Sequence, residues 1–159
     1  MPQYWLTTHW PPVRSSPQDN DRLNVHIQHK FKDYLSSMQP GDRVLFYETA
    51  TGPPKLINGK LEKRENGRKA IVCDARVATP LELRPEYEPE EFNGRILDFR
   101  WQARTDDRRD LLIPRAAVIE WLGYGKGYTF QGFNAGRGIL RIDETKYIDL
   151  LRNYSGRQQ

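Results

Sequence analysis

The chain has 159 residues, 37% of them hydrophobic and 11% aromatic, which suits one compact domain and excludes disorder along the whole length. Lys and Arg outnumber Asp and Glu by 25 to 21, and the resulting charge of +4 is modest evidence for a polyanionic partner. No apolar run approaches the ~18 residues of a membrane span and no signal-peptide order begins the chain, so we expect a cytoplasmic protein with no membrane partner.

The first third of the chain predicts a strand, a loop and a short helix. Aromatic and β-branched residues at 4–8 favour a strand, and the prolines that begin the polar segment 11–22 favour a loop. Four apolar side chains then follow the i, i+3, i+4 and i+7 spacing of one helix face: Phe31, Tyr34, Leu35 and Met38. The Pro-Gly-Asp step at 40–42 is expected to end this helix.

The middle third predicts mainly strands. Runs rich in apolar and β-branched residues at 43–49, 55–63 and 70–77 indicate a three-stranded meander. The Asn66-Gly67 pair between the last two runs favours a tight type I′ hairpin. A half-exposed strand is expected at 96–104, and a charged loop is expected to follow it at 105–110.

The last third predicts two helices on either side of a glycine-rich loop. The first of these helices is expected at 115–122, with Pro114 at its N-terminal start. Asp143 can cap the second helix. Residues 123–138 hold six of the twelve glycines and predict an irregular loop. Short strands with a few helices and no βαβ rhythm predict an α+β barrel rather than a doubly wound sheet.

The sequence lacks the motifs of common enzymes and metal sites. The segment Gly-Tyr-Gly-Lys-Gly at 123–127 has no Ser or Thr after its lysine, as a phosphate loop would require. Cys73, the only cysteine, lies in an apolar run and is expected to be buried. His26 and His29 supply only two candidate metal ligands. We therefore predict no catalytic residue, no metal and no cofactor.

Aromatic residues beside basic ones indicate a different chemistry. Trp10 ends the first strand, where its indole can either line a groove or close one end of a barrel. Tyr128, Phe130 and Phe133 lie among glycines, which let a backbone approach a ligand closely. Aromatic faces with interspersed Arg and Lys suit stacking on nucleobases, with the phosphates neutralised alongside.

Three segments carry a family resemblance: Tyr-Trp-Leu-Thr at 4–7, Pro-Gly-Asp-Arg-Val-Leu-Phe-Tyr at 40–47, and Gly-Arg-Gly-Ile-Leu-Arg-Ile-Asp at 136–143. With them the chain resembles an EVE domain of the PUA-like superfamily, which also relates it to YTH and ASCH domains. The resemblance implies one domain over residues 1–159, folded as a small bent β-barrel flanked by short helices. In the similar YTH readers, a base is turned out of the nucleic acid into an aromatic-lined pocket.

The resemblance places a base pocket between the first strand, the segment before the first helix and the glycine-rich loop. The implied base-binding residues are Thr8, His9, Trp10, Asn24, His26, Gln28, Tyr128, Phe130 and Phe133. Asn24, His26 and Gln28 can hydrogen-bond a base edge, or they can serve in capping and surface solvation. This segment lacks the Trp and Gly that such domains commonly have there. The residues expected on phosphates are Lys30, Arg100, Arg104, Arg137 and Arg141.

The sequence therefore predicts a monomeric, non-enzymatic module that recognises a turned-out, modified base in DNA or RNA, and leaves its effector protein open. One alternative is a PUA-like RNA-binding protein without modification specificity. The other is an ASCH-like enzyme acting on RNA or a nucleoside, in which Lys30, His26 or Tyr47 would do acid–base chemistry.

Overall fold

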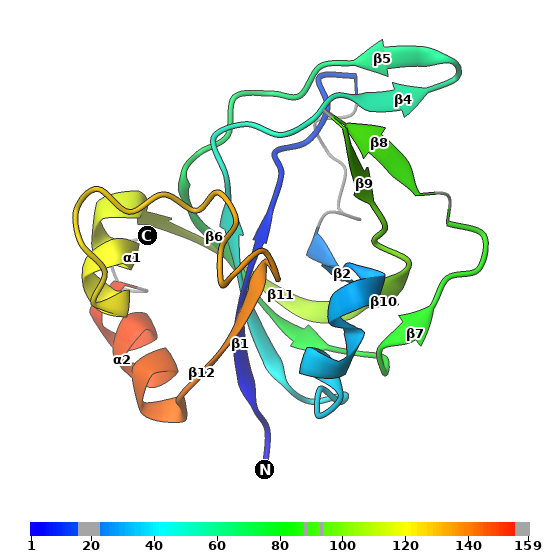
Figure 1. Ribbon diagram of the computed structural model, residues 1–159. Coiled ribbons are helices and arrows are strands. Elements are labelled where there is room, and N and C mark those ends of the chain that lie inside the picture. Colours follow the sequence, from blue (N-terminus) through cyan, green and yellow to red (C-terminus); the bar gives the residue numbers. More distant parts are fainter. Residues whose placement is uncertain (16–22, 88, 93, 155–159) are drawn as a thin grey trace.

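The computed structural model describes residues 1–15, 23–87, 89–92 and 94–154, which form a mixed α+β fold (Figure 1). The largest sheet has the strand order β11-β6-β3-β1-β12. Its strands are β1 (Tyr4–His9), β3 (Arg43–Glu48), β6 (Ala70–Val77), β11 (Thr105–Pro114) and β12 (Ile139–Ile142). Helices α1 (Arg115–Leu122) and α2 (Glu144–Tyr154) lie together at one side of this sheet.

A second sheet and a 3-10 helix cover the other side. The three-stranded sheet has the order β2-β10-β7, from β2 (Val25–Ile27), β10 (Trp101–Ala103) and β7 (Glu82–Leu83). The 3-10 helix η2 (His29–Leu35) follows β2 directly. Two hairpins complete the described elements: β4 (Lys55–Ile57) with β5 (Lys60–Glu62), and β8 (Glu90–Phe92) with β9 (Arg95–Leu97).

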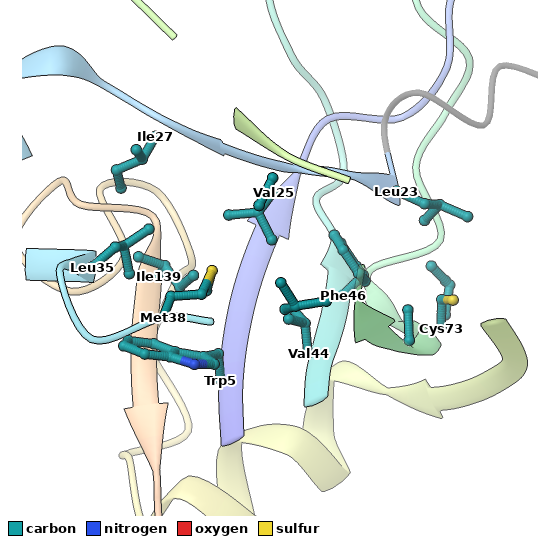
Figure 2. Packing of buried hydrophobic residues seen from close by; sticks show 14 of the residues in the cluster. Trp5, Leu23, Val25, Ile27, Leu35, Met38, Val44, Phe46, Cys73 and Ile139 are labelled. Atoms are coloured by element: carbon teal, nitrogen blue, oxygen red, sulfur yellow. The ribbon is translucent and has the colours of Figure 1, made fainter. Parts of the chain in front are cut away.

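Strand β1 pairs in parallel with β3 and antiparallel with β12, so it lies inside the sheet. Alternate residues of such a strand point to opposite faces. Trp5 and its partner Val44 belong to the core beneath β2 and η2, whereas Leu6 and Leu45 belong to the core beneath the helices. Figure 2 shows the first of these cores. Because both faces are covered, β3 is a nearly continuous apolar run.

The Pro-Gly-Asp step anchors the N-terminus. Asp42 is fully buried, and its carboxylate accepts hydrogen bonds from Trp5 Nε1 at 3.1 Å, Gln3 N at 3.0 Å and Gln39 N at 3.1 Å. A buried carboxylate needs such donors to offset its lost hydration. This part of the family-like segment therefore has a structural role.

A second buried carboxylate, Asp74 of β6, lies under the helices. The Tyr147 hydroxyl donates to this carboxylate, whose two oxygens both lie 2.9 Å away, and Asp74 pairs with Arg43 at 3.0 Å and with Arg109. Burial, followed by the nearby Asp74 charge, raises the pKa of Tyr147 to about 12. These contacts tie α2 to β3, β6 and β11.

Several predicted elements are confirmed. The strand at 4–8, the run at 43–49, the strand at 70–77 and the helix at 115–122 all form, and α2 begins directly after Asp143. Cys73 is buried as expected, and burial raises the pKa of its thiol to about 11. Part of the predicted loop, residues 16–22, lies outside the described residues.

Other predictions were wrong. Strands β3 and β6 pair directly, so residues 43–78 are not a meander. The hairpin turn lies at Asn58-Gly59, where both residues have positive φ, and not at Asn66-Gly67. Residues 105–110 belong to strand β11, whose pairing with β6 passes through two irregularities. The sheet ends at β12 without returning to β11, so the described strands form no closed barrel.

Candidate nucleic-acid interface

The end of β1, helix η2 and the glycine-rich loop meet at one place. Thr8 N donates to Gly138 O at 2.9 Å, and the Thr7 hydroxyl donates to the same carbonyl at 2.9 Å. A Cβ added to Gly136 would lie 3.9 Å from Cζ of Phe31, and this glycine has a φ of +83°. Glycine thus supplies the left-handed backbone here, and the loop packs against η2 at ordinary van der Waals distance.

A line of cations and half-buried rings runs along this junction. Lys30 Nζ lies 5.1 Å from the Phe31 ring centroid, and the Arg137 guanidinium lies 4.7 Å from that of Tyr34. The Tyr34 hydroxyl in turn accepts a hydrogen bond of 3.3 Å from Arg141 N. We call these residues the basic–aromatic strip: Lys30, Phe31, Tyr34, Arg137 and Arg141.

The charges of the strip remain available to a ligand. Among the described residues, no carboxylate forms an ion pair with Lys30, Arg137 or Arg141. Lys30 and Arg141 are exposed, while Arg137 is half-buried over its ring. A guanidinium on an aromatic face keeps its N–H groups free for a phosphate while its plane is held in position.

The other two arginines predicted on phosphates lie elsewhere. Arg100 donates to both oxygens of Asp98, at 2.8 and 2.6 Å, and this contact lowers the pKa of Asp98. Arg104 is exposed where β10 leads into β11, on the second sheet rather than in the strip. Only Lys30, Arg137 and Arg141 of the five predicted cations are thus brought together.

Asn24 and His26 do not face the strip. The buried side chains of Val25 and Ile27 point from β2 into the core (Figure 2), so the residues that alternate with them point to the outer face. The side-chain Oδ1 of Asn24 accepts hydrogen bonds from Thr105 N at 3.0 Å and Arg108 Nη2 at 3.1 Å. This side chain fastens β2 to β11, which corrects its assignment to a shared base pocket with Thr8.

Gln28 and His9 each make a polar contact that involves a backbone carbonyl near the junction. Gln28 precedes η2, and its carbonyl accepts a 2.9 Å hydrogen bond from Phe31 N. His9 Nδ1 lies 2.9 Å from the Trp10 carbonyl, and its ring packs 5.9 Å from that of Phe46. Both side chains are half-buried, and both stay predictions as base contacts.

Trp10 is held by neighbours on several sides. Its ring meets that of Phe99 edge-on at 5.6 Å, and the Arg64 guanidinium lies 5.0 Å from it. Gly52 packs against the indole so closely that an added Cβ would lie 2.5 Å from its Cγ. The half-buried indole therefore has a packing role, and no contact joins it to the aromatic residues of the glycine-rich loop.

Two aromatic residues of that loop, which the sequence analysis expected on a base, are buried in the core instead. Phe130 and Phe133 are buried, and Phe130 stacks on Tyr47 with ring centroids 3.9 Å apart. They belong to the core beneath the helices and cannot stack on a base in this conformation. Tyr128 is only half-buried, with its ring 4.4 Å from that of Tyr124. The loop thus contributes Arg137 and its glycines to the interface, and its phenylalanines to the core.

The residues proposed for acid–base chemistry form no cluster. Tyr47 is 1% exposed, so its hydroxyl is out of reach of a substrate. Burial also raises the pKa of Tyr47 to about 12, so the phenol stays protonated at neutral pH. Lys30 is exposed in the strip, and His26 lies on the outer face of β2. Among the described residues, no group of His, Cys, Asp and Glu could hold a metal ion, and no helix is long and apolar enough to cross a membrane.

No protein-family model and no curated protein matches the chain. Solved structures do match it. A hypothetical protein from Leishmania major is 14% identical to this chain, with a TM-score of 0.53. The match covers 100% of this chain and 98% of the Leishmania protein. Rpa0253 from Rhodopseudomonas palustris is 14% identical, with a TM-score of 0.52 over 96% of this chain and 93% of its own.

Human THYN1, solved in complex with DNA that contains 5-methylcytosine, is 11% identical to this chain. Its TM-score is 0.51, and the match covers 95% of this chain and 96% of THYN1. Identities this low establish the fold alone. THYN1 is an EVE/PUA-like domain, and the chain shares its mixed α+β fold, although the described strands do not close into the small barrel that the resemblance implies.

Proposed function

We propose that this protein binds nucleic acid without altering it chemically, and that the basic–aromatic strip is its main contact surface. The observation that carries the proposal is that Lys30 and Arg137 lie over the half-buried rings of Phe31 and Tyr34, with the exposed Arg141 beside them through its backbone N–H to the Tyr34 hydroxyl. Cations without carboxylate partners neutralise phosphates, and aromatic faces stack on bases at about 1–3 kcal/mol per base. The strip brings such cations and aromatic rings together where η2 meets the glycine-rich loop.

We further propose that the bound base is turned out of its helix and carries a modification. The structure of THYN1 with DNA containing 5-methylcytosine supports this extension through the shared fold. Turning a base out of a duplex costs a few kcal/mol, which stacking and phosphate contacts must offset. We also propose that the Thr8 hydroxyl, which adjoins Gly138 O at 3.4 Å beside the strip, meets the edge of such a base.

The selectivity is tested with DNA duplexes that are identical except for one 5-methylcytosine. Burying the extra methyl group gains ~0.8 kcal/mol, so we expect about fourfold tighter binding of the methylated duplex in a fluorescence-anisotropy titration. An RNA of the same sequence is the comparison for nucleic-acid type. Equal affinities for both duplexes would overturn recognition of this modification, and intact oligonucleotides after incubation are expected from a protein that only binds.

A further inference from the structure

Beside η2, on the second sheet, Trp101 and His29 form one nearly flat surface. Trp101 Nε1 donates to His29 Nδ1 at 2.8 Å, and the two ring planes differ by only 16°. An N–H bond lies in the plane of its own ring, so this hydrogen bond joins the rings edge to edge. The centroid separation of 6.3 Å agrees with that arrangement. We call this pair the Trp101–His29 platform.

The hydrogen bond fixes the orientation of the platform. His29 accepts at Nδ1, so its neutral ring carries the hydrogen at Nε2. Trp101 is half-buried against the core that contains Val25 and Ile27, whereas His29 is exposed. The indole is thus held from below by packing and at its edge by the imidazole. A ring preorganised in this way loses little entropy when a ligand stacks on it.

A groove with a cation adjoins the platform. Its volume is about 280 Å³, and Trp101 lines it together with Lys32, Ser36 and the apolar side chains of Leu35 and Leu81. Lys32 Nζ lies 5.4 Å from the Trp101 ring centroid. Asp33 also lines the groove and pairs with Lys32 at 3.9 Å, but its side chain is 97% exposed, so this surface pair is weak and a phosphate can replace it. The aromatic face, the apolar floor and the nearby cation together match a nucleotide, with its base on the indole and its phosphate at Lys32.

We propose that the Trp101–His29 platform is a second nucleobase site, which stacks a base of the same strand that crosses the basic–aromatic strip. The inference rests on the proposed function, because it requires nucleic acid on the strip. Helix η2 connects the two sites: it carries Phe31 and Tyr34 of the strip, and also His29 of the platform and Lys32 of the groove beside it. Seven residues of 3-10 helix extend only about 14 Å, so a single short strand can reach both.

The test is an abasic scan of a single-stranded DNA of about 12 nucleotides, with affinity measured by fluorescence anisotropy. One base is removed at each position in turn, which leaves every phosphate in place. For the wild-type protein we expect two positions at which removal weakens binding by about 5- to 150-fold, one for each site. Trp101→Leu should abolish the penalty at one position and keep the penalty at the other.

His29→Ala is the second variant, since this side chain is exposed and its removal leaves the core intact. It should reduce the same penalty as Trp101→Leu, whereas Lys126→Gln in the glycine-rich loop should change neither. A penalty that stays the same in both platform variants would overturn the second site while the proposed function stands. If the intact strand fails to bind the wild-type protein, the second site falls, whereas the proposed function falls only if a DNA duplex also fails to bind.

Discussion

Replacing Asp74 with alanine is expected to destabilise the fold by about 3–5 kcal/mol, because it removes one partner of a buried ion pair. Asp74 is fully buried, accepts a hydrogen bond from the Tyr147 hydroxyl and forms ion pairs with Arg43 and Arg109. The Arg43 side chain is only 15% exposed and would lose its buried carboxylate partner, keeping only the exposed Asp107 at 3.0 Å. Arg109 is 57% exposed and would be solvated instead, so the main cost falls on Arg43 and Tyr147. Urea denaturation gives the change in unfolding free energy.

The matched control is Asp106→Ala, which breaks an ion pair at the surface. Asp106 pairs with Arg76 at 2.8 Å, and both side chains are about half exposed. Exposed pairs contribute about 0–1 kcal/mol, so this variant should unfold close to the wild-type urea midpoint. Equal losses for Asp74→Ala and Asp106→Ala would mean that the buried network does not stabilise the domain.

Trp5→Ala is expected to cost about 3–5 kcal/mol, the usual loss for truncating a buried tryptophan. Trp5 is 1% exposed, packs in the core shown in Figure 2 and donates to the buried Asp42 carboxylate at 3.1 Å. Trp5→Phe keeps much of the apolar area but removes the N–H donor. It should therefore lose less stability than Trp5→Ala in the same urea titration. A wild-type midpoint for Trp5→Ala would contradict its place in the core.

Elements whose pattern depends on local chemistry were predictable from the sequence. The helix before Gly123 and the helix after Asp143 carry their own end signals, and both form. Strand β11 was not predictable, because its first half is the charged run Asp-Asp-Arg-Arg-Asp. These side chains are exposed on an edge strand, and backbone pairing with β6 holds them in place. A charged edge strand has the composition of a loop, so only the tertiary pairing distinguishes the two.

The candidate site was predictable only in part. Thr8, Lys30, Arg137 and Arg141 do lie together, because β1 pairs with β12 and the loop before β12 packs against η2. Phe31 and Tyr34 were expected only as apolar residues of a helix face. The packing of the glycine-rich loop against η2 turns them into half-buried surface rings. Asn24, Phe130 and Phe133 were misplaced because strand register and the path of a loop are set by partners distant in sequence.

The most direct test of nucleic-acid binding through the strip is the salt dependence of affinity for a DNA duplex. Three phosphate contacts predict that log affinity falls with log salt at a slope of about −2.7. A variant with Lys30→Gln, Arg137→Gln and Arg141→Gln should bind weakly with a slope near zero. A control with Lys60→Gln, Lys63→Gln and Lys126→Gln removes the same net charge from exposed sites outside the strip and should keep the wild-type slope. Identical slopes for the two triple variants, or a wild-type slope near zero, would contradict binding through the strip.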